Sequence, residues 1–133
     1  MLIAQDDSSH RDWFIGIYSS VIKISFWNTD GTRKDLESSF LPTVSEWTHL
    51  CGTISEGYIK LYVNGILNET ETYTGDLRTI STITTIGNFD GSDFFNGSID
   101  EVRIYNRALS ADEIRNLYEQ RDEIHDPFVY KTV

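Results

Sequence analysis

Apolar and polar residues alternate along most of the chain, at the two-residue period of a β-strand. Within residues 12–19 the apolar residues of one face are Trp13, Ile15 and Ile17, and within residues 22–28 they are Ile22, Ile24 and Phe26. The pair Asp30-Gly31, which follows, is typical of a hairpin turn. The pattern therefore predicts two strands and then a polar edge strand over residues 33–39.

The middle of the chain predicts further hairpins of the same kind. The strands expected here lie at residues 46–55, 58–63, 66–73, 83–86 and 98–105. Two of them are joined by Asn64-Gly65, a pair that tolerates the positive φ angles of a type I′ turn. Short strands with turns every 8–12 residues or so indicate a sandwich or a barrel of antiparallel sheets.

One helix is predicted close to the end of the chain. Ser110 and Glu113 have the spacing of a capping box, and Leu109 is placed to pack on Ile114 as a hydrophobic staple. The residues after this start repeat at helical spacing on one face, which predicts a short surface helix docked on the sheets. The tail, residues 121–133, is apolar enough to add a strand, and the sequence does not decide where.

The length of 133 residues fits one domain with its core in residues 12–120. Apolar runs are far shorter than the ~20 residues of a membrane-spanning helix, so we expect no membrane insertion. The first residues show neither the basic region nor the apolar core of a signal peptide. Either the protein stays inside the cell or its secretion signal lies outside this chain.

The charge balance excludes one class of partner. Eleven basic and 21 acidic residues give a net charge of −10 at pH 7. Because nucleic acid and anionic membranes require a clustered basic surface, neither is an expected partner. An acidic surface suits solubility and hard cations such as calcium. The single cysteine, Cys51, excludes an internal disulfide and is interpreted as a small buried apolar residue.

Several segments resemble one family in order and spacing. They read WTHL at residues 47–50, KLYVNG at residues 60–65 and FNGSIDEVRIYNRALS at residues 95–110. These segments resemble the laminin-G-like, concanavalin A-like jelly-roll domain, and the resemblance covers residues 13–118. It implies an all-β fold, a sandwich of two antiparallel sheets with one short C-terminal helix.

The chain departs from that family at its start. Members usually carry a few dozen residues before the strand predicted at Asp12, and those residues contribute opening strands that pair with the closing one. Three explanations stay open: the chain is a fragment, it is a trimmed relative, or its tail or a neighbour fills the vacant sheet edge. An unfilled edge favours pairing with another chain, either in a homo-oligomer or within a larger protein.

Calcium is the expected cofactor. Asp100 falls in phase with Val102 and Ile104 in an extended strand, and a buried carboxylate needs a cation or several hydrogen-bond donors. In the family, the matching Asp commonly helps to bind a structural calcium. The alternatives are that a bulge turns Asp100 outward or that backbone amides satisfy it. Asp90 and Asp93 lie in a loop that resembles half of a calcium loop, and an ordinary solvated turn is the alternative there.

The sequence predicts no enzyme. Some relatives are glycoside hydrolases that use a Glu-x-Asp-x-x-Glu arrangement, which is absent here. Asp100 and Glu101 are adjacent, so in a strand they point to opposite faces. The histidines are scattered, and neither a Gly-x-Ser-x-Gly motif nor a phosphate loop occurs.

We expect a non-catalytic recognition module of an extracellular or cell-surface protein that binds a glycan or a protein. Sugars stack on aromatic faces, although buried aromatic residues also fill cores. The candidate ligand-binding residues are Trp13, Tyr18, Trp27, Tyr58, Tyr62 and Phe94. A second hypothesis is a structural subunit that joins neighbouring chains through sheet edges. A third is a hydrolase whose acid and base lie on different strands.

Overall fold

The computed structural model describes residues 2–6, 10–55, 57–80, 83–88, 91 and 93–124. Its strands are β1 (Ile3–Asp6), β2 (Arg11–Tyr18), β3 (Val21–Trp27), β4 (Arg33–Glu37), β5 (Leu50–Ser55), β6 (Tyr58–Val63), β7 (Ile66–Thr72) and β8 (Thr84–Ile86). One helix, α1 (Ala111–Ile124), follows them. Among the described residues no helix is long and apolar enough to cross a membrane.

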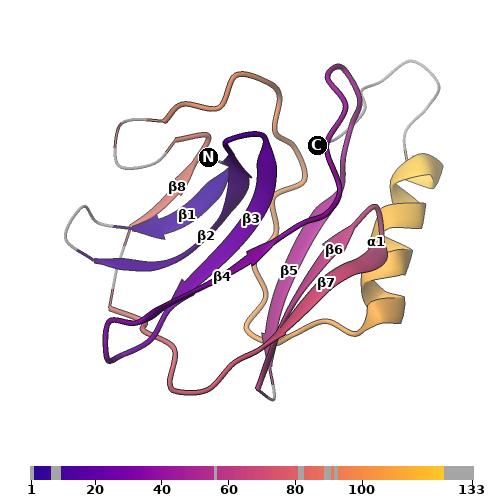
Figure 1. Ribbon diagram of the computed structural model, residues 1–133. Coiled ribbons are helices and arrows are strands. Elements are labelled where there is room, and N and C mark those ends of the chain that lie inside the picture. The colour runs from indigo at the N-terminus through magenta and orange to yellow at the C-terminus, as the bar shows by residue number, and fades with distance from the viewer. Residues whose placement is uncertain are drawn as a thin grey trace.

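The strands form two antiparallel sheets that face each other. One sheet has the order β4-β3-β2-β1-β8 and the other the order β5-β6-β7. Helix α1 packs on the outer face of the three-stranded sheet (Figure 1). The predicted fold, an all-β sandwich of two antiparallel sheets with one C-terminal helix, is confirmed.

The core lies between the two sheets and follows from the two-residue period. Every second residue of β3 points inward, and so does every second residue of β6. The buried side chains that meet there are Ile22, Ile24 and Phe26 from β3 and Ile59, Leu61 and Val63 from β6. Each fully buried side chain of this size stabilises the fold by about 1.5–3 kcal/mol relative to exposure.

The local turn and cap signals are confirmed. Asn64 and Gly65 both have positive φ, 51° and 76°, between β6 and β7. At the start of α1, the Glu113 amide donates to Ser110 Oγ at 3.2 Å and the Ser110 amide donates to a Glu113 carboxylate oxygen at 2.8 Å. The capping box therefore fixes where α1 begins. Leu109 and Ile114 are both buried in one cluster against the three-stranded sheet.

Two parts of the fold differ from the sequence prediction. The strand expected at residues 98–105 is wrong, because this segment is in no strand, although it runs beside β5 (Figure 1). Extended residues become a strand only where a neighbour supplies ladder hydrogen bonds, and alternation alone does not supply one. The unpredicted strand is β1, which pairs with both β2 and β8.

Candidate functional site

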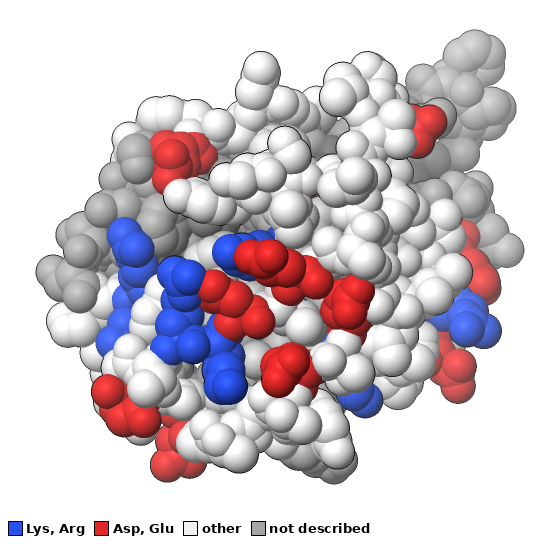
Figure 2. All heavy atoms as spheres, viewed as in Figure 1, with Lys and Arg blue, Asp and Glu red and all other residues white. Residues whose placement is uncertain are grey.

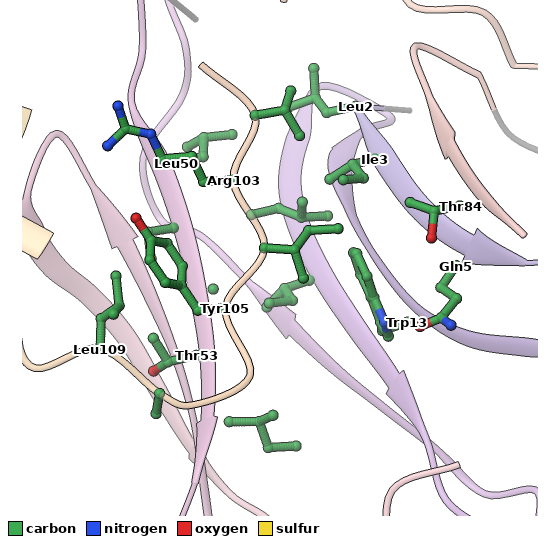
Figure 3. Close-up of a pocket in the computed structure, with 18 of the residues that line it drawn as sticks. Leu2, Ile3, Gln5, Trp13, Leu50, Thr53, Thr84, Arg103, Tyr105 and Leu109 are labelled. Carbon is green, nitrogen blue, oxygen red and sulfur yellow. Dashed lines mark hydrogen bonds between the residues drawn. The ribbon is translucent and has the colours of Figure 1, made fainter. Parts of the chain in front are cut away.

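A groove with a cavity volume of about 780 Å³ opens between the two sheets (Figure 3). We call it the β5 groove, because it runs along β5, an edge strand of the three-stranded sheet. Its lining comes from β1 and β2 on one side, from β5 on the other, and from residues 99–109. The groove therefore lies where the two sheets are not closed against each other.

The wall formed by the five-stranded sheet is largely apolar. Ile3, Trp13 and Ile15 all line it, because residues of one parity in β1 and β2 face the interior. The indole Nε1 of Trp13 donates a hydrogen bond to Gln5 Oε1 at 2.7 Å, which satisfies the one polar atom of that ring. Figure 3 shows these two side chains turned toward each other. This wall offers few free polar groups to a ligand.

The wall formed by β5 is accessible from both of its faces. Leu50, Gly52 and Ile54 line the groove from the face that looks toward the first sheet. Cys51 and Thr53 line it from the opposite face, which looks toward α1. Burial raises the pKa of the Cys51 thiol to about 11, so at neutral pH it is protonated and a poor nucleophile.

The third wall, residues 99–109, contributes the only carboxylates among the described lining residues, Asp100 and Glu101. Both are exposed, so of the alternatives that the sequence leaves open for Asp100, the structure has the one in which its side chain is turned outward. An Asp100 carboxylate oxygen accepts the Glu101 amide at 2.8 Å, and Glu101 pairs with Arg103 at 2.6 Å. No other Asp or Glu is among the described residues that line the groove.

The part of the chain that the structure describes contains no set of side chains arranged to bind calcium. Asp93 and Asp100 are exposed, and Asp90 lies outside the described residues. No group of three or more His, Cys, Asp or Glu side chains among the described residues is arranged to hold a metal ion. Because calcium takes six to eight oxygen ligands, Asp93 and Asp100 do not fit such a site by themselves.

A second surface lies on the outer face of the five-stranded sheet. It consists of Tyr18, Lys23, Arg33, Asp35 and Glu37, and we call it the Tyr18 patch. Lys23 Nζ lies 5.7 Å from the centre of the Tyr18 ring, 2.6 Å from a Glu37 carboxylate oxygen and 3.7 Å from one of Asp35. Arg33 pairs with Asp35 at 2.5 Å. On the face over which β4 runs, Figure 2 shows basic and acidic side chains side by side.

Strand register explains why these charges meet. Lys23 lies opposite Glu37 in the β3–β4 ladder, and Arg33, Asp35 and Glu37 alternate along β4 on one face. The candidate residues predicted from the sequence did not include these four charged side chains. A charged residue at every second position of the predicted edge strand is the signal that identifies the three on β4, Arg33, Asp35 and Glu37.

The six predicted aromatic residues occupy different environments. Tyr18, Tyr58 and Phe94 are exposed, whereas Trp27 and Tyr62 are buried. Trp27 lies under the Arg33 guanidinium, 5.6 Å from its ring centre, and Tyr62 lies beneath α1. Trp13 is half-buried and lines the β5 groove. The structure therefore brings Tyr18 together with charged partners, and it does not bring the six residues into one site.

The two facing antiparallel sheets and the helix on one outer face define a concanavalin A-like β-sandwich domain. Residues 1–115 match the laminin-G model described as "Concanavalin A-like lectin/glucanases superfamily". The chain therefore belongs to this superfamily.

Known proteins agree with this assignment. Human pentraxin-related protein PTX3 is 33% identical over 115 residues, which are 76% of this chain and 30% of PTX3. An S-layer domain-containing protein of Clostridium thermocellum superimposes with a TM-score of 0.54 at 27% identity, covering 84% of this chain and 59% of that one. The binding domain of Paraclostridial Mosquitocidal Protein 1 has a TM-score of 0.64 at 21% identity, covering 90% of this chain and 31% of its own. This last likeness shows the fold alone.

Proposed function

We propose that this chain is a non-catalytic recognition module of an extracellular or cell-surface protein and that it binds a carbohydrate through the Tyr18 patch. The observation that carries the proposal is an exposed aromatic ring beside paired charged groups on a sheet surface. The side chain of Tyr18 is 55% exposed, and Lys23, which contacts its ring, is held by Glu37.

The chemistry of the patch matches that of a sugar. The C–H face of a pyranose ring packs against an aromatic ring, and its hydroxyl groups both donate and accept hydrogen bonds. Asp35 and Glu37 provide acceptors, and Lys23 and Arg33 provide donors. Because the two cations and two carboxylates balance, the patch favours an uncharged sugar over an anionic one.

Recognition rather than catalysis is supported by the arrangement of acidic groups. The described residues of the β5 groove offer Asp100 and Glu101 as neighbours on one segment and no facing carboxylate. A location outside the cell is supported by the likeness to an S-layer domain-containing protein. The chain spans less than a third of PTX3, so the activity of the whole parent protein is a separate question.

The test is a glycan array followed by calorimetry on any sugar that the array retains. Replacement Tyr18→Ala removes the ring, and we expect at least a tenfold loss of affinity, which corresponds to about 1.4 kcal/mol. The matched control is Tyr58→Ala. Tyr58 is 48% exposed and has Lys60 Nζ 6.0 Å from its ring centre, but it lies on the other sheet.

Two results would contradict the proposal. One is an array that retains nothing. The other is a retained sugar whose affinity Tyr18→Ala leaves unchanged, or lowers no more than Tyr58→Ala does. Loss in the first variant alone would assign the sugar to the outer face of the five-stranded sheet.

A structural subunit is the second candidate function. It is favoured by one observation, the position of β5 at the edge of the three-stranded sheet, where β6 is its one strand neighbour among the described residues. Edge strands carry N–H and C=O groups that pair with another chain. Light scattering behind a sizing column separates this candidate from the first, because a subunit forms a defined multimer of the 15.3 kDa chain.

A further inference from the structure

We propose that the β5 groove is an acceptor site for a β-strand and that its occupant is the C-terminal segment of this same chain, residues 126–133. This inference is independent of the proposed carbohydrate site, which lies on the outer face of the other sheet. Residues 126–133 are outside the described part of the chain, and the shape of the groove and the sequence of the segment support the proposal.

The groove has the form of a missing strand. Its lining wraps around the free edge of β5, reaching Gly52 and Ile54 on one face and Cys51 and Thr53 on the other. A ligand that only covered the sheet would contact one face. A strand added beside β5 projects side chains alternately to both faces and pairs its backbone with the edge between them.

The wall opposite β5, formed by residues 98–107, also pairs with no strand among the described residues. Residues 98–107 run beside β5 between the two sheets without belonging to either (Figures 1 and 3). Three apolar side chains of this segment stay open to solvent, Val102 at 40%, Ile104 at 62% and Tyr105 at 44% exposure. A strand between this segment and β5 would bury apolar surface on both sides, which is the dominant favourable term in association.

Apolar side chains lie on both sides of the groove, together with polar residues at its margins such as Asp100, Arg103 and Gln120. One side is lined by Trp13, Ile15 and Ile24, and the other by Leu109 and Leu117. Strands buried on both faces appear in sequences as nearly continuous apolar runs rather than as strict alternation. A largely apolar polypeptide segment therefore fits this groove better than a hydroxyl-rich sugar does.

The C-terminal segment has this composition. Residues 127–130 read Pro-Phe-Val-Tyr, and residues 131–133 read Lys-Thr-Val. Phe, Val, Tyr and Thr favour strands, and Pro is tolerated at the first residue of one. In an extended conformation Phe128 and Tyr130 fall on one face and Val129 and Val133 on the other.

The segment also begins next to the groove. Leu117 and Gln120 of α1 line it, and the helix ends at Ile124, about 6 Å further along its axis. Residues 125–133 reach up to about 30 Å when extended, and β5 needs about 20 Å. In Figure 1 the last turn of α1 and the start of β5 lie at the same end of the molecule. The added strand would therefore run parallel to β5.

The experiment compares the full chain with a chain that ends at His125, by hydrogen exchange of backbone amides. We expect the amides of β5 and of residues 100–106 to be protected in the full chain and to exchange at least tenfold faster in the shortened one. A synthetic peptide of residues 126–133 should restore protection to the shortened chain. Amides of β3, which lies between β4 and β2 in the other sheet, are the internal reference.

Point variants keep the test decisive if the shortened chain does not fold. Phe128→Ser with Tyr130→Ser removes apolar side chains from one face, whereas Lys131→Ser changes the same segment without removing one. Loss of β5 protection in the first variant only supports the proposal. Equal protection in the full chain, the shortened chain and both variants overturns it.

Measuring amide protection at several protein concentrations tests whether the added strand comes from the same chain or from a second copy. A strand donated by the same chain gives protection that is independent of protein concentration, in a particle of about the monomer mass. Protection that appears only with a dimer, and disappears on dilution, would assign the strand to a second copy and overturn the proposal for the same chain.

Discussion

Glu113 has two roles at the start of α1, because its carboxylate both caps the helix and pairs with Arg107 outside it. Arg107 donates to the two carboxylate oxygens at 2.7 and 2.9 Å. The Arg107 guanidinium, followed by the Ser110 amide, lowers the pKa of Glu113 to about 2. The start of α1 is therefore stabilised both by the capping box and by the ion pair between Glu113 and Arg107.

This pair predicts a stability difference that depends on pH. The folded pKa of Glu113 lies below its unfolded value, so the charged carboxylate stabilises the fold above about pH 4.5. The stabilisation is lost as the pH falls toward 2. We expect Glu113→Gln to lower the melting temperature at pH 7, with the difference from the native chain vanishing near pH 2.

The control for this prediction is Asp112→Asn, a neighbouring first-turn carboxylate. It removes a charge that favours the helix dipole without disturbing the cap. Melting curves of the three proteins between pH 2 and 7 are the measurement. An equal shift for both variants at pH 7 would mean that the effect is the dipole alone and that the Arg107 pair contributes nothing.

Residue exposure is the part of the candidate site that sequence could not supply. Strand periodicity assigns a residue to one of two faces, but Tyr18 and Trp27 both lie on the outer face of the same sheet. Tyr18 is exposed, whereas the Arg33 side chain lies over Trp27. An outer-face residue is buried only where another element covers it, as α1 covers Tyr62. The local sequence pattern contains no information about that covering element.

At the scale of elements, one buried charge pair ties β2 to the loop that follows β7. Arg78 Nε lies 3.3 Å from an Asp12 carboxylate oxygen, and Asp12 has no exposed side-chain surface. Arg78 also donates to the carbonyl of Arg11. Because the loop after β7 leads toward β8, this contact fixes the path by which the chain crosses from the second sheet back to the first.

Removing the cation from this pair should be costly. We expect Arg78→Met to destabilise the protein by about 3 kcal/mol, because it removes the Arg78 cation from a carboxylate that has no exposed surface. Arg103→Met is the matched control, since Arg103 pairs with Glu101 where both side chains are 49% exposed, and its expected cost is about 0–1 kcal/mol. Urea unfolding of both variants measures the difference. Similar losses would show that burial of Asp12 is not what makes the first pair important.

The elements themselves were largely predictable, and the exceptions have a common cause. The strands of the central hairpins follow from alternation and from turn pairs such as Asn64-Gly65, which act locally. Residues 98–105 alternate in the same way but have no ladder partner among the described residues, and β1 became a strand because β2 and β8 flank it. Pairing between distant segments decided both cases, and a single sequence does not contain that information directly.

At the scale of the whole molecule, two opposing features control association. The net charge of −10 at pH 7 keeps copies apart, whereas an edge strand such as β5, where no other strand covers it, favours contact with another chain. Salt screens the first effect, with a Debye length of about 10 Å at 0.1 M and about 3 Å at 1 M. It does not weaken backbone pairing or apolar burial. Conditions that screen the charge repulsion between copies therefore reveal whether the edge of β5 is available to pair with another chain.

The chain that ends at His125 should associate where the full chain does not. At pH 7 and low salt we expect both to scatter as monomers, the full chain at about 15.3 kDa. In 1 M salt, or near the sequence pI of about 4.5, the shortened chain should form dimers or larger species while the full chain stays monomeric. Light scattering at matched concentrations is the measurement. Equal association of both chains would show that residues 126–133 do not protect the edge, and a defined multimer of the full chain at pH 7 would favour the structural subunit over the carbohydrate-binding module.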